Sequence, residues 1–205
     1  MTLFFPYLFA ALVVTVNSLV CDCTKGPGCS VDGTCTISDP TGVCMTMAHE
    51  NNLGGREMSG LYKACQYDSQ ACGEKIMSIT AEKGLFWRSN TACCEKDHCN
   101  TASIRVPPKN LTQNTLRCPA CFTFGSDRCK NTETLHCTGA ESHCIHFSGM
   151  LSAGAEAFAP FASAGCGTAT ACSLPARSAL YSGNMAFVFN TIVCHPVVNA
   201  TSGIL

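Results

Sequence analysis

The chain consists of short apolar runs separated by polar turns rich in glycine and proline, with little sign of a helical period. Residues 75–80 and 85–89 are two extended runs on either side of the polar segment 81–84, a pattern that predicts a β-hairpin. Residues 186–193 have the same character and predict the counterpart strand later in the chain. The pattern therefore favours an all-β protein built from short strands.

The first eighteen residues form a separate apolar segment without charge, interrupted only by Pro6 and Thr15 between Leu3 and Val16. Val16 and Ser18 precede a suitable cleavage point, so residues 1–18 are predicted to be a signal peptide. A membrane anchor would need about 20 apolar residues, and a lipid-anchor signal would need an apolar tail of about 10–20 residues. The C-terminal VVNATSGIL does not provide that tail. We expect a secreted, extracellular protein without a membrane anchor.

All 18 cysteines follow this segment, a density typical of a secreted disulfide-rich scaffold. They form two blocks, whose two long steps and intervening short step are 21, 7 and 21 residues in the first and 22, 6 and 22 in the second. This agreement indicates an internal duplication. The expected domains are residues 19–100 and 116–205, joined by a polar linker, residues 101–115, which Pro107 and Pro108 stiffen.

The first block begins with Leu19-Val20-Cys21 and ends with Cys93-Cys94-Glu95-Lys96-Asp97-His98-Cys99-Asn100. A terminal double cysteine, four residues and Cys-Asn resemble the three-finger domain of the urokinase-receptor/lymphocyte-antigen superfamily. The resemblance implies an all-β, disulfide-rich fold of two tandem three-finger domains. The disulfides that it implies are Cys21–Cys44, Cys23–Cys29, Cys35–Cys65, Cys72–Cys93, Cys94–Cys99, Cys118–Cys144, Cys121–Cys129, Cys137–Cys166 and Cys172–Cys194.

Two features depart from the family pattern. Only Asp22 separates the first two cysteines of block one, where the family usually has two residues, as in Cys118-Pro119-Ala120-Cys121. In block two, His195 follows Cys194 where a second cysteine would stand, so the last small disulfide loop is expected to be open or absent.

Segments 51–55, 91–94 and 137–144 resemble both the gamma-type phospholipase A2 inhibitors and the sodefrin-precursor-like pheromone proteins, to which the whole mature chain is similar. The first resemblance implies a non-catalytic inhibitor of secreted phospholipase A2. The alternatives are a secreted pheromone or signalling protein and a soluble receptor-like adhesion module. The expected partner is accordingly a secreted protein, a phospholipase A2 or a receptor. A net charge of −1 does not favour nucleic acid as a partner.

The segment 93–100 and a second cluster contain residue types that serve catalysis or metal binding. A phospholipase site would need a glycine-rich calcium loop, which this chain lacks. The second cluster offers zinc ligands, but an oxidising compartment would pair its thiols; its residues are Cys118, Cys121, His136, Cys137, His143, Cys144 and His146. We therefore expect neither an enzyme nor a cofactor or metal.

Binding by long inter-cysteine loops remains, and we expect these loops at residues 45–64, 73–92, 145–165 and 173–193. Phe86 and Trp87 suit either an aromatic binding anchor or core packing. The nearly uncharged segment 153–164 suits either a contact surface or a face between the domains. Asn110 and Asn199 each begin a glycosylation acceptor sequence.

Charge differs between the halves of the mature chain. Residues 19–100 contain seven Lys/Arg and ten Asp/Glu, a net charge of −3, and residues 101–205 contain six and four, a net charge of +2. An acidic first domain suits a basic phospholipase or a cationic receptor site, or docking on the second domain.

If every cysteine is paired, the native protein should contain no reactive thiol. Titration of the unreduced protein with a thiol reagent in denaturant should give no signal above a cysteine-free control. The same assay after full reduction should find 18 thiols per chain. A substoichiometric thiol in the unreduced protein would contradict the pairing.

Overall fold

The computed structural model describes residues 18–24, 26, 28–53, 55–67, 72, 75–130, 133–153, 158–182 and 185–196. Residues 1–17 of the expected signal peptide and the acceptor Asn199 lie outside the described residues. The first half contains β1 (Leu19–Asp22), β2 (Thr34–Ile37), β3 (Val43–Asn51), β4 (Met58–Gln66), β5 (Lys75–Ala81), the 3₁₀ turn η2 (Glu82–Gly84) and β6 (Phe86–Cys94). The second half contains β7 (Gln113–Phe124), β8 (Glu133–Thr138), β9 (His143–Ala153), β10 (Phe158–Gly167), the helix α1 (Ala169–Cys172), β11 (Ala179–Ser182) and β12 (Met185–Pro196).

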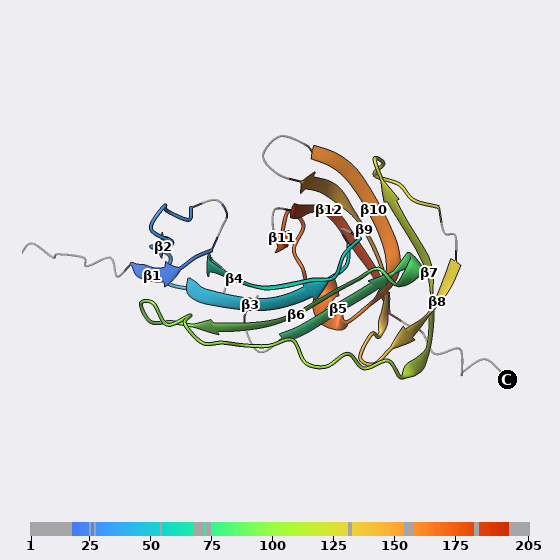
Figure 1. Cartoon of the computed structure of the whole chain (residues 1–205), viewed down its shortest axis with the longest axis horizontal. Coiled ribbons are helices and arrows are strands. Elements are labelled where there is room, and N and C mark those ends of the chain that lie inside the picture. Colours follow the sequence, from blue (N-terminus) through green and yellow to red (C-terminus); the bar gives the residue numbers. More distant parts are fainter. Residues whose placement is uncertain are drawn as a thin grey trace, which may run out of the picture.

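The fold is nearly all β, as the sequence predicts (Figure 1). The hairpin predicted at residues 75–89 is confirmed, since β5 and β6 pair antiparallel from Lys75 with Thr91 to Thr80 with Phe86. The segments expected to be long binding loops are mainly β-hairpins instead, such as β3–β4. Cross-strand hydrogen bonds, rather than water, satisfy their backbone groups.

The two halves repeat one arrangement of strands. The main strands of the first half lie in the order β4-β3-β6-β5, and those of the second half lie in the corresponding order β10-β9-β12-β11. A short pair precedes each set, β1–β2 in the first half and β7–β8 in the second. The duplication seen in the cysteine spacing is therefore a duplication of topology.

Nine disulfides fasten the bases of these hairpins, and no cysteine is free. They join Cys21–Cys44, Cys23–Cys29, Cys35–Cys65, Cys72–Cys93, Cys94–Cys99, Cys118–Cys144, Cys121–Cys129, Cys137–Cys166 and Cys172–Cys194. The structure thus brings together the same cysteines that the family resemblance pairs. Each crosslink of this kind typically stabilises a small domain by about 2–4 kcal/mol.

The halves are joined edge to edge into one continuous sheet. Strand β5 of the first half pairs antiparallel with β10 of the second, where Ala81, Thr80 and Ile79 face Gly165, Cys166 and Gly167. In Figure 1 the strands of the second half curve over those of the first. The sequence did not decide whether the domains lie apart or side by side, and the structure places them side by side.

Gly165 makes this junction sterically feasible. A Cβ atom at that position would lie 2.0 Å from the carbonyl oxygen of Thr80, a distance at which the backbone would have to move. The strand edges can therefore pair closely only because residue 165 has no side chain.

One apolar core lies inside the curved sheet and contains side chains from both halves. Met47, Met77, Ile79 and Trp87 of the first half pack in the same cluster as eight residues of the second half: Ile145, Phe147, Leu151, Phe161, Ala171, Leu180, Phe187 and Phe189. Trp87 and Phe161 each contact Phe187 edge to face, with ring centroids 6.2 and 5.7 Å apart. The two domains therefore share a core, which compensates for the small core that each could bury alone.

The segment 153–164 contributes to this junction. Ala153 is the last residue of β9, and residues 158–164 belong to β10, in which Phe161 and Ala162 are buried. Of the two roles that the sequence left open for this segment, the structure favours packing between the halves.

Buried polar groups also join the two halves. Glu141, 2 % exposed, accepts hydrogen bonds from the hydroxyls of Ser78 (2.8 Å) and Thr80 (2.7 Å). The backbone NH of Ser78 donates to the hydroxyl of Thr168, and the backbone NH of Thr168 donates back to the carbonyl of Ser78. Since a buried carboxylate is costly unless it is hydrogen-bonded, these contacts fix the relative orientation of the halves.

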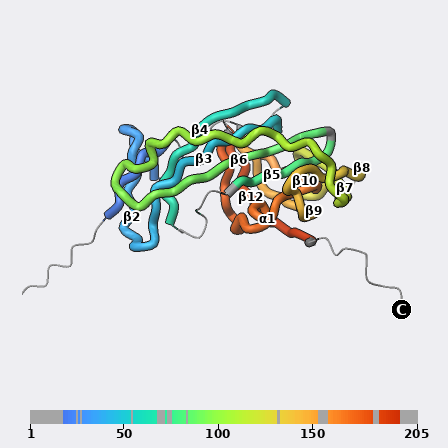
Figure 2. The backbone as a smooth tube through the Cα atoms, turned by 90° about the horizontal axis from the view of Figure 1, so that it is seen from below, coloured from blue at the N-terminus to red at the C-terminus, as the bar shows by residue number. Residues whose placement is uncertain are grey.

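The segment between the halves is not a free tether. Figure 2 shows it running back along the first half before β7 begins. Arg88 donates to the carbonyl oxygens of Pro107 (2.6 Å) and Pro108 (3.2 Å), and Asn90 donates to that of Arg105. Strand β7 starts at Gln113, inside the stretch expected to be a linker.

Gly165→Ala tests the junction between the halves. The added methyl group should force β10 away from β5 and lower the free energy of unfolding by about 1–3 kcal/mol, the usual cost of overpacking. The control is Gly60→Ala, whose Cβ would lie 3.2 Å from an imidazole atom of His49 instead of against backbone. Urea denaturation would measure both variants, and equal stability of Gly165→Ala and wild type would refute the role of the glycine.

Candidate functional site

Segment 93–100, which has the residue types of an active site, forms a closed structural knot. Cys93 is bound to Cys72, and Cys94 closes a small loop with Cys99. His98 lies in that loop with φ = 52°, in the left-handed region that few non-glycine residues occupy, and its backbone NH donates to Val20. No thiol in this cluster is available as a nucleophile.

Asn100 ends the knot by binding backbone on two strands. Its side-chain oxygen accepts from the NH of Asp22 (3.0 Å), and its side-chain NH₂ donates to the carbonyls of Asp22 (2.8 Å) and Met45 (3.1 Å). The residue is 3 % exposed, and this set of contacts makes its role structural.

His98 reaches the surface, where it pairs with Asp22. Its Nδ1 lies 2.9 Å from one Asp22 oxygen, and Lys63 lies 3.4 Å from the other. The hydrogen bond from His98, with a smaller contribution from Lys63, lowers the pKa of the Asp22 carboxyl below its usual value. The group is an ion pair at the base of the first domain, with both its carboxylate oxygens occupied.

The cysteines of the second domain that could bind zinc are crosslinked, as are those of segment 93–100. The sulfurs of Cys118, Cys137 and Cys166 lie within 4.8 Å of one another, and all three are buried. Each sulfur belongs to a disulfide, so none offers the thiolate that zinc requires. No histidine joins this group among the described residues.

Phe86 and Trp87, the suggested aromatic anchor, are 8 % and 1 % exposed. Trp87 stacks on His49 at a centroid distance of 5.3 Å, and Lys109 of the connecting segment lies 4.5 Å from the ring centre of Phe86. Both residues therefore take the packing role in this chain, and neither presents a free aromatic surface.

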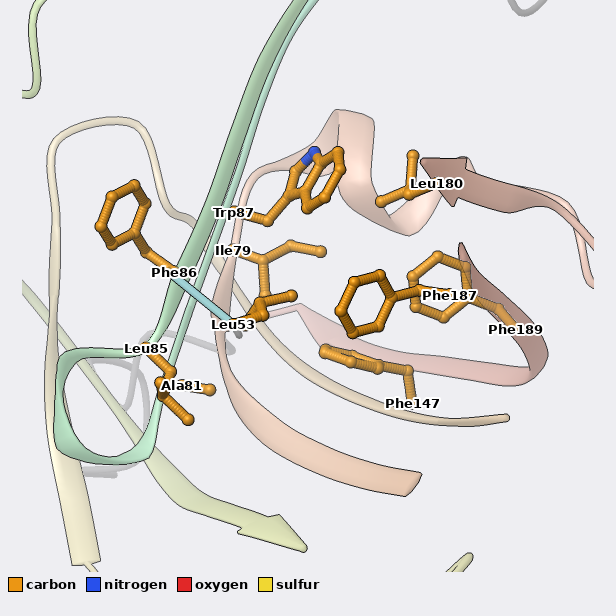
Figure 3. Close-up of a pocket in the computed structure, with 10 residues that line it drawn as sticks. All are labelled: Leu53, Ile79, Ala81, Leu85, Phe86, Trp87, Phe147, Leu180, Phe187 and Phe189. Atoms are coloured by element: carbon orange, nitrogen blue, oxygen red, sulfur yellow. The ribbon is translucent and has the colours of Figure 1, made fainter. Parts of the chain in front are cut away.

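A small cavity remains in the shared core, and Figure 3 shows its apolar lining from both halves. Its volume of about 10 Å³ is room for roughly one water molecule. Leu53, Ile79 and Trp87 line it from the first half, and Phe147, Phe187 and Phe189 line it from the second. A space of this size and polarity is a packing defect and does not hold a substrate.

The described residues form mainly β-strands, crosslinked by disulfides. Among the described residues, α1 has only four residues, and none of the helices has the length and apolar character needed to cross a bilayer. Asn110 is exposed, and its side chain accepts a hydrogen bond from the NH of Thr112 within the acceptor sequence. Its use as a glycosylation site remains a prediction, as does that of Asn199.

The u-PAR/Ly-6 domain model matches this chain twice, over residues 18–102 and 114–196. The chain therefore belongs to the u-PAR/Ly-6 family.

The curated proteins that are similar to it include the following three. Protein RoBo-1 of Rattus norvegicus is 33% identical over 113 residues, which cover 55% of this chain and 44% of that protein. A phospholipase A2 inhibitor gamma subunit of Gloydius brevicaudus siniticus is 28% identical over 153 residues, 70% of this chain and 74% of that protein. Phospholipase A2 inhibitor PIP of Malayopython reticulatus is 30% identical over 88 residues, 43% of this chain and 42% of that protein. The chain thus spans less than half of two of these relatives.

Among solved structures, mouse TEX101 is 23% identical to this chain, with coverage of 77% of this chain and 82% of that one. The TM-score is 0.31.

The buried His49 should make stability depend on pH. Burial lowers the pKa of His49 below the usual value of about 6.5, and its Nδ1 has no hydrogen-bond partner among the described residues. The unfolded state then binds more protons than the folded state once the pH falls below about 6.5. Stability is therefore intact above this pH and decreases below it, by up to about 1.4 kcal/mol per pH unit, until the folded pKa is passed.

Urea midpoints at pH 7.5, 6.5 and 5.5 would measure this effect, and His49→Phe is the matched control. The range avoids the titration of Asp22, whose lowered pKa lies far below it. The variant should lose less stability than wild type between pH 7.5 and 5.5. Identical pH profiles would show that His49 takes up its proton without cost.

Proposed function

We propose that this protein is an extracellular, non-catalytic binding protein that inhibits a secreted phospholipase A2 by covering the enzyme's lipid-facing surface. The supporting observation is the similarity to a phospholipase A2 inhibitor gamma subunit over 70% of this chain and 74% of that relative. A second relative named as a phospholipase A2 inhibitor matches a shorter part of the chain. Membership of the u-PAR/Ly-6 family agrees with a binding role.

The chemistry of the chain supports an extracellular role without catalysis. All its cysteines are in disulfides, which persist in oxidising compartments outside the cytosol. The histidine of the 93–100 knot pairs with Asp22, and the sulfurs of the zinc-like cluster are crosslinked. The candidate catalytic groups therefore have structural partners.

Charge favours a basic enzyme as the target. The first domain, residues 19–100, has a net charge of −3, with seven basic and ten acidic residues. Complementary charge mainly accelerates association and weakens as salt screens it. A basic phospholipase A2 should therefore bind faster than an acidic one.

Titration of the purified protein against a panel of basic and acidic secreted phospholipases A2 tests this function. We expect saturable inhibition of at least one basic enzyme on phospholipid vesicles, weaker inhibition on a monomeric substrate, and a loss of potency with added salt. Reduced and alkylated protein is the control, because inhibition that survives unfolding would reflect depletion of substrate. Unaltered activity of every enzyme would refute the function.

A further inference from the structure

Strand β4 exposes a bare edge to solvent. Among the described residues it is the terminal strand of the sheet and is paired with β3 on one side only. Ser59, Gly60 and Leu61 are all exposed, and Leu61 is 44% exposed. Successive residues of a strand point to opposite faces of the sheet, so three exposed residues in succession mean that solvent reaches both faces of β4 at this edge of the sheet. Such edges are normally covered, because they template pairing with another chain.

The hydrogen bonds at one end of β4 show which groups point outward. Thr24 donates its backbone NH to the carbonyl of Lys63 (3.0 Å), and the NH of Lys63 donates to the Thr24 hydroxyl (3.0 Å). Because outward-facing backbone groups recur every second residue, those of Leu61 and Ser59 also point away from β3. Thr24 thus binds the outward backbone groups of Lys63 but not those of Leu61 and Ser59.

The second half shows what this edge accepts. Cys166 and Cys65 occupy equivalent disulfides, which aligns Pro160 to Ala162 of β10 with Ser59 to Leu61 of β4. On β10 this edge carries an extended segment, the part of β7 from Cys121 to Phe124, paired with residues 161–164. The NH of Gly125 extends the ladder by donating to the carbonyl of Pro160 (2.7 Å). The first half lacks this cover among the described residues.

Strand β11 lies opposite β4 but does not fill the edge (Figure 1). The two strands are the first and the last in the strand order of the sheet, and they are not paired with each other within the described residues. They meet through stacked rings of Tyr62 and Tyr181, with centroids 5.1 Å apart. Closure like that of β5 on β10 is hindered, because Ala64 stands where β10 has Gly165, whose Cβ would lie 2.0 Å from the opposing backbone.

We propose that Ser59–Leu61 of β4 is a docking edge for an extended segment of the protein partner, which adds to the sheet as an antiparallel strand. This inference rests on the proposed binding function and names its surface. The segment would exchange main-chain hydrogen bonds with Ser59 and Leu61 and would have apolar side chains at alternate positions, as Phe122-Thr123-Phe124 does on β10. A second copy of the chain is a poorer occupant, since its equivalent segment is already paired with its own β10.

A synthetic peptide provides a probe that does not require the natural partner. It copies residues 119–125 with serine at position 121, Pro-Ala-Ser-Phe-Thr-Phe-Gly. Titrated into the isotope-labelled, disulfide-bonded full chain, it should shift the amide NMR signals of Ser59 to Lys63 saturably at concentrations up to about 1 mM. A peptide N-methylated at alternate backbone nitrogens should not, since it cannot complete the ladder.

Leu61→Pro removes the outward NH while sparing the ladder to β3, as proline at a strand edge does. It should lose peptide binding and reduce inhibition of any responsive phospholipase at least tenfold, whereas Leu61→Ala should retain peptide binding. If Leu61→Pro does not fold, the N-methylated peptide gives the same comparison on the wild-type protein.

The outcomes separate this proposal from the proposed function. Peptide shifts confined to β4 with no phospholipase inhibited would support the docking edge and refute the inhibitor. Inhibition unchanged by Leu61→Pro, with no peptide shift at residues 59–63, would refute the docking edge alone. A dimer in sedimentation velocity that Leu61→Pro dissociates would also overturn the proposal, because the occupant would then be a second copy.

Discussion

The close approach of β10 to β5 determines the rest of this structure. Gly165 leaves room for the backbone of Thr80, so an edge strand of one three-finger domain continues the sheet of the other. Once the sheets are joined, Trp87 and Phe187 bury each other in a common core. Disulfides hold the base of each hairpin, but the edge pairing and the core fix how the two domains lie together.

Duplication produces two equivalent seams with different outcomes. The β5–β10 seam is closed by main-chain pairing and by the buried carboxylate of Glu141. At the β4–β11 seam the described strands are not paired by main-chain hydrogen bonds, and the rings of Tyr62 and Tyr181 stack across it. The difference follows from small local changes, such as alanine at position 64 where the other copy has glycine. A repeated fold can therefore keep one edge for its own assembly and leave the equivalent edge to another protein.

Local patterns in the sequence predicted much of the architecture. The apolar runs around residues 81–84 predict the β5–β6 hairpin because hairpin pairing depends on neighbouring residues and a turn. The family signature around Cys93 and Asn100 predicts the knot, in which the side chain of Asn100 binds backbone groups. The burial of the aromatic pair could not be predicted from a local pattern. Phe86 and Trp87 have the same sequence context as a surface anchor, and only the tertiary structure places Lys109 over Phe86 and packs Trp87 against His49 and Phe187.

The sequence by itself determined the all-β class, the two cysteine blocks and the absence of a calcium loop, because these depend on composition and on spacing along the chain. Tertiary structure decided which faces are hidden and which edges remain bare. The pairing of Ala81 with Gly165 and the stacking of Tyr62 on Tyr181 join residues more than eighty positions apart. No local pattern encodes such contacts, since they arise from the way two folded domains fit together.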